Sequence, residues 1–220
     1  VWYVLNSSNN TLSAATFGLV GDTPMARDYD GDGKTDIAVT RRTGGNLIWY
    51  ILGSNVGFYA HQFGLATDSE APGDYDGDGK FDIAIHRQGS VTGSQAFYYI
   101  WQSSDSGVVV FPWGLYGHTV VPGDYDGDSK TDAAIMRRNS TDLVWYILRS
   151  SDSNFIAQTF GLKETDFPTQ NDYDGDGKTD ISVWRESEGI FYIFKSSNST
   201  LTGVNWGWIS DFPIASYDSH

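Results

Sequence analysis

The chain has 220 residues, a formal net charge of −14 at pH 7, an aromatic content of 15% and no cysteine. This acidity argues against a nucleic-acid partner, the lack of cysteine excludes a disulfide framework, and no apolar run is long enough to span a membrane. The chain begins at Val1 without a recognisable signal peptide, which favours a mature product or an excised piece of a longer chain.

In chain order, the first predicted elements are two strands at residues 2–5 and 14–17. Four longer units follow, and each is predicted to contain four strands, named A to D here. Strand A leads into an acidic loop, strand B follows the loop, strand C carries an aromatic pair, and strand D ends at an aromatic residue followed by glycine. Examples are residues 70–73 for A, 36–41 for B, 47–52 for C and 155–160 for D.

The units repeat with a nearly fixed period, because the acidic loops begin at residues 28, 74, 124 and 172, which are 46, 50 and 48 residues apart. The repeats span approximately residues 1–20 (partial), 21–67, 68–117, 118–164, 165–210 and 211–220 (partial). Several short strands in such a period, without an amphipathic helix, are typical of a propeller blade. The sequence therefore predicts an all-β fold, a single β-propeller domain over residues 1–220 built of four-stranded antiparallel blades.

The two ends of the chain predict about five blade positions, of which the last is composite and incomplete. The chain starts inside a unit, at strands C and D. It stops inside another, where Ser216 to His220 align with the start of an acidic loop and no strand B follows. The alternative is a fragment of a longer propeller.

Each acidic loop places aspartates at positions 1, 3, 5 and 9 of nine residues, and glycine at position 4 lets the backbone turn sharply. Carboxylates at alternate positions of a tight loop converge on one point, and hard oxygens suit Ca²⁺. About four Ca²⁺ sites are predicted, with the backbone carbonyl of the position-7 lysine as a further ligand and its ammonium group in water. The predicted ligands are Asp28, Asp30, Asp32, Lys34, Asp36, Asp74, Asp76, Asp78, Lys80, Asp82, Asp124, Asp126, Asp128, Lys130, Asp132, Asp172, Asp174, Asp176, Lys178 and Asp180.

An EF-hand is the competing interpretation of these loops, and the sequence excludes it. An EF-hand requires a bidentate carboxylate at position 12 and flanking helices. The four residues at position 12 are apolar, namely Val39, Ile85, Ile135 and Val183. The surrounding residues form short apolar runs that are typical of strands.

The aromatic–glycine marker, the Asp-x-Asp-x-Asp-Gly-x-x-Asp loop and the apolar strand after it resemble the FG-GAP or VCBS repeats of integrin-α-like β-propellers. This resemblance covers nearly the whole chain, and it implies that each loop joins the first two strands of a blade and holds Ca²⁺. Ser129 departs from the pattern, since it occupies position 6 of the third loop where glycine is usual. We expect that site to bind more weakly.

Positions that differ between the repeats are candidates for a unique ligand site. One slot on strand B holds Thr40, His86, Met136 or Trp184, and the next slot always holds arginine, for which packing on the aromatic pair is the favoured interpretation. The residues singled out as candidate ligand contacts are His86, Trp101, Trp184 and Trp208. Packing in the core is the alternative for each of them.

The residues predict no catalytic site, because no histidine cluster, triad or pair of catalytic carboxylates can be assembled. We therefore expect a secreted or cell-surface, non-catalytic recognition or adhesion module that binds a glycan, as a lectin does, or an extracellular protein. The resemblance to similar repeats in adhesion proteins and fungal lectins favours this hypothesis. The alternative is a catalytic or accessory propeller domain of a calcium-dependent polysaccharide-degrading enzyme.

Overall fold

The computed structural model describes residues 1–208, 211 and 213, and the regular elements of these residues are eighteen β-strands. They form two compact units, residues 1–68 and 69–220. Within the described residues, no helix has the length and apolar character needed to cross a membrane.

The first unit contains a two-stranded hairpin and one four-stranded antiparallel sheet. The hairpin pairs β1 (Trp2–Leu5) with β2 (Leu12–Ala15). The sheet has the order β3 (Thr23–Pro24), β4 (Ile37–Thr43), β5 (Asn46–Gly53), β6 (Gly57–Leu65). The hairpin corresponds to the predicted C and D strands of the partial blade, although β2 begins and ends two residues before the predicted strand at 14–17. The four-stranded sheet is the first complete blade.

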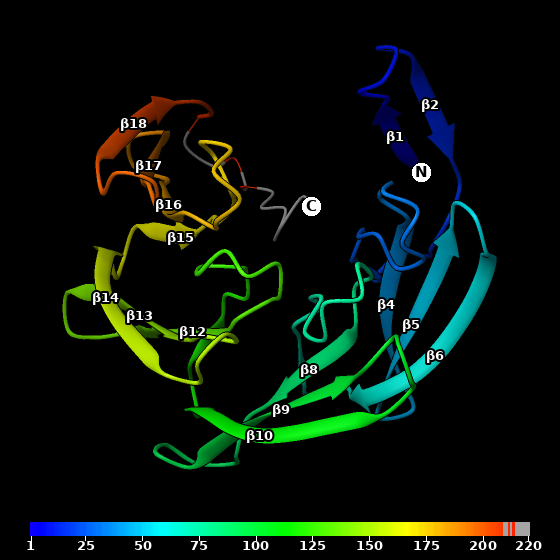
Figure 1. The fold of residues 1–220 in the computed structure, drawn as a ribbon, viewed down its shortest axis with the longest axis horizontal. Helices are drawn as coiled ribbons and strands as arrows, with labels where there is room; N and C mark the ends of the chain where they lie inside the picture. The colour runs from blue at the N-terminus through cyan, green and yellow to red at the C-terminus, as the bar shows by residue number, and fades with distance from the viewer. Residues whose placement is uncertain (209–210, 212, 214–220) are drawn as a thin grey trace. The chain divides into compact units, whose positions relative to one another are not determined.

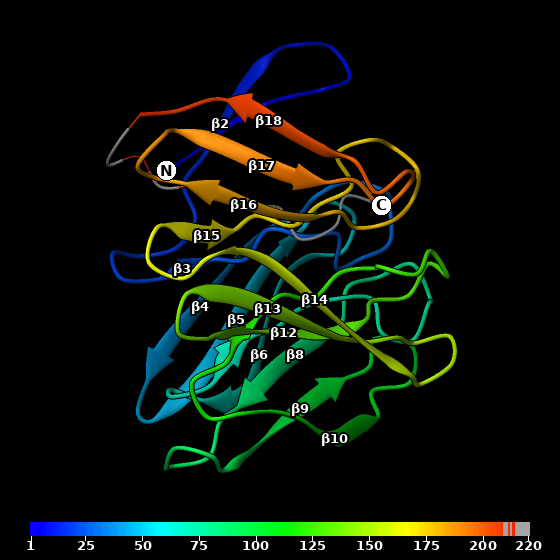
Figure 2. The ribbon, with the colours of Figure 1, turned by 90° about the vertical axis from the view of Figure 1, so that its left-hand side faces the viewer.

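The second unit contains three further four-stranded antiparallel sheets, each in simple sequential order. Figures 1 and 2 show the strands of each sheet lying side by side. The first sheet consists of β7 (Ser69–Glu70), β8 (Ile83–Arg87), β9 (Gln95–Trp101) and β10 (Val108–Leu115). The second consists of β11 (Thr119–Val120), β12 (Ala133–Arg138), β13 (Asp142–Leu148) and β14 (Phe155–Leu162). The third consists of β15 (Asp166–Pro168), β16 (Ile181–Arg185), β17 (Ile190–Phe194) and β18 (Leu201–Asn205).

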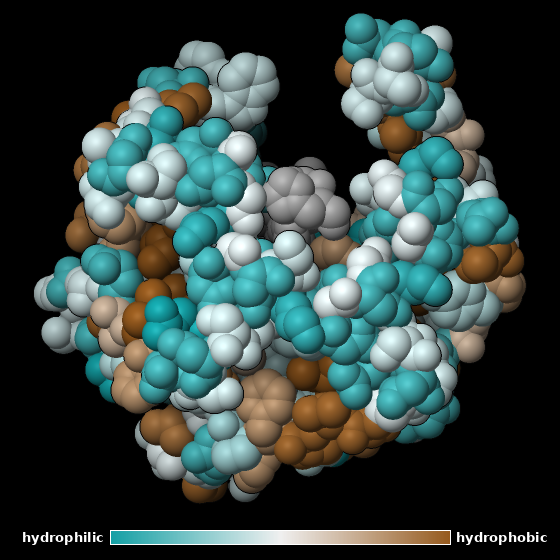
Figure 3. Space-filling model, viewed as in Figure 1, coloured by the Kyte–Doolittle hydropathy of each residue, from teal (hydrophilic) through white to brown (hydrophobic). Residues whose placement is uncertain are grey.

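Burial follows the position of a strand in its sheet. The B strand β8 is buried along nearly its whole length, as expected of a strand covered on both faces. The C strand β5 alternates between buried and half-buried residues. The D strands are more open, and Figure 3 shows an apolar patch over β10, where Val108, Val109 and Val110 are exposed.

The core of the second unit lies between successive sheets. One cluster joins Met136 of β12 and Trp145 of β13 to Val183 of β16, and a second joins Tyr98 of β9 to Ile135 of β12. Four-stranded antiparallel sheets that pack face to face through their B and C strands are blades of a β-propeller. The predicted fold class is confirmed, with four complete blades. The remainder of the predicted composite blade, at residues 211–220, falls almost entirely outside the described residues, and the single domain over residues 1–220 stays a prediction.

Candidate metal centres

Each acidic loop connects strands A and B of its blade, and its first aspartate shapes the turn. In the first loop, the carboxylate of Asp28 accepts hydrogen bonds from the backbone N–H groups of Gly31 and Gly33, both at 2.7 Å. Both glycines have a positive φ, which favours glycine. In the third loop Ser129 adopts the same left-handed conformation with φ 66°, and its N–H donates to Asp124 at 2.8 Å. The serine therefore preserves the loop geometry, and weaker binding there stays a prediction.

The aspartate at position 9 is buried at the bottom of each loop. In the third loop, Asp132 is fully buried and accepts the N–H of Tyr125 at 2.9 Å and the N–H of Ser150 at 2.7 Å. The other three loops repeat this pair of bonds. Burial, followed by the neighbouring carboxylate of Asp126, raises the pKa of Asp132 to about 7 despite these donors. We call the converging aspartates of one loop its cage. Without a cation, burial and mutual repulsion disfavour the negative charges of these carboxylates.

A pair of residues in the turn between strands C and D completes each cage. In the third blade, the hydroxyl of Ser150 donates to Asp128 at position 5 over 2.8 Å, and the hydroxyl of Ser151 donates to Asp126 at position 3 over 2.6 Å. In the first blade, Ser54 fills the first role, and the backbone N–H of Asn55 replaces the second hydroxyl at 2.7 Å. The sequence showed these residues only as a polar turn. The structure assigns them to the acidic site.

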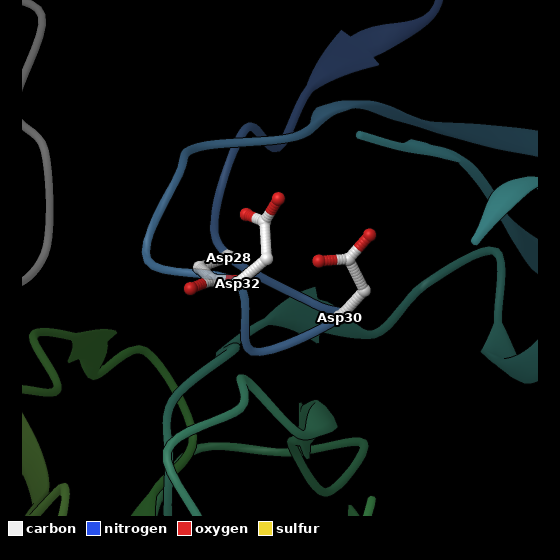
Figure 4. A group of neighbouring side chains, drawn as sticks. All are labelled: Asp28, Asp30 and Asp32. Carbon is white, nitrogen blue, oxygen red and sulfur yellow. The ribbon is translucent and has the colours of Figure 1, made fainter. Parts of the chain in front are cut away.

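The carboxylates of each loop converge, as predicted from their spacing. In every loop, three aspartates each offer an oxygen, and the three oxygens lie within 4.8 Å of one another. Figure 4 shows Asp28, Asp30 and Asp32 on the loop of the first blade. The grouped aspartates are Asp28, Asp30 and Asp32; Asp74, Asp76 and Asp78; Asp124, Asp126 and Asp132; and Asp172, Asp174 and Asp180.

The cages also contain the vacant acceptors that a cation requires. In three of the four loops, the Oδ1 atom of the position-3 aspartate is buried and has no hydrogen-bond donor among the described residues; these are Asp30, Asp126 and Asp174. A buried carboxylate oxygen without a partner is costly. Several such oxygens at one point fit a hard divalent cation that prefers oxygen ligands, such as Ca²⁺. The residues present therefore fit the predicted metal.

Consecutive loops in the second unit are joined by direct hydrogen bonds. The N–H of Thr131 donates to the carbonyl of Asp74 in the preceding loop at 2.6 Å, and the N–H of Thr179 donates in the same way to Asp124. The ammonium group of Lys130 donates to the carbonyl of Asp76 at 2.9 Å. The expectation that the position-7 ammonium lies in water is therefore wrong for Lys130, because the preceding loop offers an acceptor within reach.

The candidate ligand contacts separate into buried and exposed residues. His86 and Trp184 are buried on strand B, where the imidazole Nε2 of His86 lies 3.0 Å from the carbonyl of Trp113, and the indole N–H of Trp184 donates to the carbonyl of Trp206 at 3.3 Å. Such positions serve packing rather than stacking on a ligand. Trp101 is half-buried within β9.

The two buried candidates share one structural role, which depends on the residue opposite them on strand C. In blades with tryptophan on strand C, the indole N–H donates to the backbone carbonyl of the aromatic residue in the aromatic–glycine marker, as Trp145 does to Phe160 at 2.9 Å. His86 and Trp184 lie opposite Tyr98 and Phe191, and neither of these rings replaces that bond. The residue on strand B then reaches the carbonyl instead.

Trp208, by contrast, is 81% exposed, and it lies beside a hollow in the fourth blade. The hollow has a volume of about 760 Å³. Trp206, which is also exposed, lines it together with Trp208. Its polar lining includes Glu186, Glu188, Asn205 and Asp211.

The repeated arginines of strand B have structural partners. Arg41, Arg87, Arg137 and Arg185 each place the guanidinium group over the tyrosine ring of strand C, at 4.6, 4.7, 5.5 and 4.5 Å from the ring centre. Arg41 also pairs with Asp22 at 2.7 Å, and Arg185 pairs with Asp166 at 2.8 Å. The interpretation of these arginines as packing residues is confirmed.

Comparison with known proteins supports the repeat assignment. No curated protein and no solved structure matches the chain. Residues 28–85 run from the first acidic loop through the second and into β8, and they match the family model of the FG-GAP-like repeat, which confirms over this stretch the resemblance that the loops predict.

Proposed function

We propose that the chain is a non-catalytic, calcium-stabilised recognition module that acts outside the cell. The observation that carries the proposal is the set of buried position-3 oxygens that lack a donor within otherwise fully bonded cages. The FG-GAP-like repeat and the propeller blades point to recognition or adhesion. Extracellular fluid, where calcium is abundant, would fill such sites.

Each cage would connect the A and B strands of its blade to the C and D strands. The acidic loop follows strand A, and the serine turn joins strands C and D, so the bonds from Ser150 to Asp128 and Asp132 connect the two halves. Bound Ca²⁺ would supply positive charge to the converging carboxylates. The hydrogen bonds from the serine turn hold the carboxylate oxygens of the loop in place.

Isothermal titration calorimetry tests the metal part of this proposal. We expect about four Ca²⁺ ions per chain, with affinities near the ~0.1–1 mM range of extracellular modules. The matched control is Glu164→Gln, which removes an exposed negative charge outside the loops and leaves the stoichiometry unchanged. Absence of calcium binding would contradict the proposal.

We further propose that the hollow beside Trp206 and Trp208 binds a glycan. Exposed indole rings can stack on the apolar face of a sugar. The carboxylates of Glu186 and Glu188 and the amide of Asn205 can accept or donate hydrogen bonds with sugar hydroxyls. Because the charged groups lining the hollow are acidic, a neutral sugar fits better than an acidic one.

A glycan array in the presence of Ca²⁺ tests this second part. We expect binding by the wild-type chain and loss of at least tenfold in affinity for Trp208→Ala. Tyr116→Ala is the control, because Tyr116 is an exposed aromatic residue that does not line the hollow. Equal loss in both variants, or no glycan bound, would contradict glycan recognition. Turnover of a polysaccharide by the chain would support the enzyme alternative instead.

A further inference from the structure

One turn between strands lacks the carboxylate that its counterparts carry. After each aromatic–glycine marker, a side chain accepts the backbone N–H of the residue that follows the glycine. In four turns this acceptor is an aspartate at 2.7–2.8 Å, namely Asp22, Asp68, Asp166 or Asp211. In the turn between β10 and β11, the N–H of Leu115 instead donates to Nδ1 of His118 at 3.1 Å. A Cβ atom on Gly114 would lie 3.5 Å from this Nδ1, as one on Gly18 would lie 3.3 Å from Oδ2 of Asp22. Histidine therefore occupies the place of the aspartate without its negative charge.

This exchange removes the ion-pair partner of one strand-B arginine. In the first blade, Nε and Nη2 of Arg41 donate to the two carboxylate oxygens of Asp22 at 2.7 and 2.8 Å, and the fourth blade repeats this bidentate pair. Arg137 holds the same position relative to His118, which offers no carboxylate. Among the described residues, the side chain of Arg137 makes no ion pair, and its one hydrogen bond runs from Nε to Oδ1 of Asn139 at 2.7 Å.

The guanidinium group of Arg137 is open as a result. It lies 5.5 Å from the centre of the Tyr146 ring, whereas the three counterparts lie at 4.5–4.7 Å from theirs. Arg137 is exposed, and the three counterparts are half-buried. Within the described part of the chain, its Nη1 and Nη2 atoms have no hydrogen-bond acceptor. A charged guanidinium group with free N–H groups is a bidentate donor for a carboxylate.

His118 supplies a second donor beside this group. Because Nδ1 accepts the N–H of Leu115, the proton of the neutral imidazole is on Nε2. Burial, followed by the charges of Arg137 and His86, lowers the pKa of His118, so the ring is neutral at pH 7. Nε2 makes no hydrogen bond to any residue that the structure describes. Two side chains therefore present N–H groups at this place.

Arg137 and His118 line one hollow, which lies between β10 and the strands β12 to β14. Its volume is about 390 Å³, and none of the described residues that line it is acidic. Its walls are mainly apolar, and they include Trp113 and Phe155, whose ring centroids lie 5.9 Å apart. The hollow thus combines an unpaired guanidinium group with aromatic walls.

We propose that this hollow binds a small aromatic carboxylate. The carboxylate group would accept the Nη N–H groups of Arg137 and the Nε2 N–H of His118, and so take the place that a turn aspartate holds beside the arginine in the first and fourth blades. The ring of the ligand would pack on Trp113 and Phe155.

The lining favours an aromatic acid over a sugar acid. The amide side chain in the lining belongs to Gln95, and its N–H₂ group already donates to the carbonyls of Ala96 and Gly114. Few groups are therefore left to bond the hydroxyls of a sugar ring. Charge also distinguishes this site from the hollow beside Trp206 and Trp208, where the charged lining residues are acidic.

Titration of the isotopically labelled chain with phenylacetate, followed by NMR, tests the proposal. We expect saturable shifts of the Trp113 indole N–H and Leu115 amide signals at millimolar ligand. The neutral analogue phenylacetamide should bind about tenfold more weakly, because it cannot form the charge-assisted bonds to Arg137. Glucuronate carries its carboxylate on a sugar ring, and it should also bind about tenfold more weakly, because it cannot pack an aromatic ring on the walls.

Substitutions at His118 and Arg137 test the two donors. His118→Asp restores the carboxylate of the other turns, so it should pair with Arg137 and weaken phenylacetate binding about tenfold without lowering the melting temperature. His118→Asn is the matched control, because it keeps a neutral acceptor for the turn; it should retain binding to within about fivefold. Arg137→Gln should weaken binding about tenfold. Arg138→Gln should not, since Arg138 is an exposed neighbour that does not line the hollow.

Four results would overturn the proposal. The first is no saturable shift at about 20 mM phenylacetate, and the second is equal binding of phenylacetate and phenylacetamide. The third is tighter binding of glucuronate, which would assign the hollow to acidic sugars. The fourth is unchanged binding in His118→Asp, which would show that Arg137 does not hold the ligand. Trp208→Ala should bind phenylacetate as the wild type does, because Trp208 does not line this hollow, so the result is independent of the glycan proposed above.

Discussion

Replacement of Asp126 by asparagine separates the metal role of an acidic loop from its structural role. Asp126 accepts one hydrogen bond, from Ser151 at 2.6 Å, through Oδ2, and its buried Oδ1 has no donor. The amide of asparagine can keep the bond to Ser151 through its oxygen and can donate its N–H₂ to a neighbouring carboxylate. In a chelator we therefore expect Asp126→Asn to change the free energy of unfolding by less than about 1 kcal/mol.

In calcium the same substitution should be costly, because it removes a charged ligand. A cation that binds only the folded chain stabilises it by about 2.7 kcal/mol when its concentration is about 100 times Kd. With a Kd of ~0.1 mM for an extracellular site, ~10 mM Ca²⁺ meets this condition. For a chain of this size, loss of that stabilisation lowers the melting temperature by roughly 5–10 °C.

Thermal unfolding followed by circular dichroism, in 10 mM Ca²⁺ and in excess chelator, measures this difference. The wild-type chain should melt markedly lower in chelator, and Asp126→Asn should show a smaller gap between the two conditions. Glu164→Gln controls for the loss of one negative charge from an exposed site. An equal decrease for Asp126→Asn in both conditions, or a wild-type melt unaffected by chelator, would refute the metal assignment.

Two further predictions test a hydrogen bond and an ion pair inside the blades. His86→Phe should lower the free energy of unfolding by about 1–3 kcal/mol in urea denaturation, because the Trp113 carbonyl loses its partner. Met136→Leu is the control at the equivalent position of strand B, and it should lower that free energy by less than about 1.5 kcal/mol. Equal losses in the two variants would contradict the role assigned to His86. Arg41 holds the pKa of Asp22 below its ordinary value of 3.8, so the ion pair stabilises the fold fully at neutral pH and loses this effect as the pH falls below 3.8. The difference in unfolding free energy between the wild type and Asp22→Asn should therefore be largest near pH 7 and shrink in acid, and a difference that does not vary with pH would argue against the pair.

The sequence was most informative where one short stretch contains the whole signal. The acidic loops place four aspartates within nine residues, so their convergence could be predicted without any long-range contact. The longer C and D strands were also predicted closely, since β5 at Asn46–Gly53 and β14 at Phe155–Leu162 differ from the predicted strands by only one or two residues at their ends. The short A strand was not, since the predicted strand at 70–73 shares only Glu70 with β7. Apolar runs between turn residues define such strands locally.

Features that depend on pairing between strands could not be read in this way. Ser150 lies 18 residues from its partner Asp132, and serine is common in any polar turn, so its link to the cage became visible only with the register. His86 and Trp184 attracted attention because they vary between repeats. Their partners across the sheet, Tyr98 and Phe191, explain that variation, and variability alone could not distinguish it from ligand binding.

The carbonyl of the aromatic–glycine marker is bonded by strand B in some blades and by strand C in others, so the two opposite positions on these strands depend on each other under mutation. Introducing tryptophan at Tyr98 would set a second donor against His86 for the oxygen of Trp113, whereas changing both residues to the Met136 and Trp145 combination of the third blade would leave a single donor. Tolerance at either site thus depends on the residue across the sheet. Mutational scans that score one position at a time would misjudge both, and grafting between repeats should transfer the pair together.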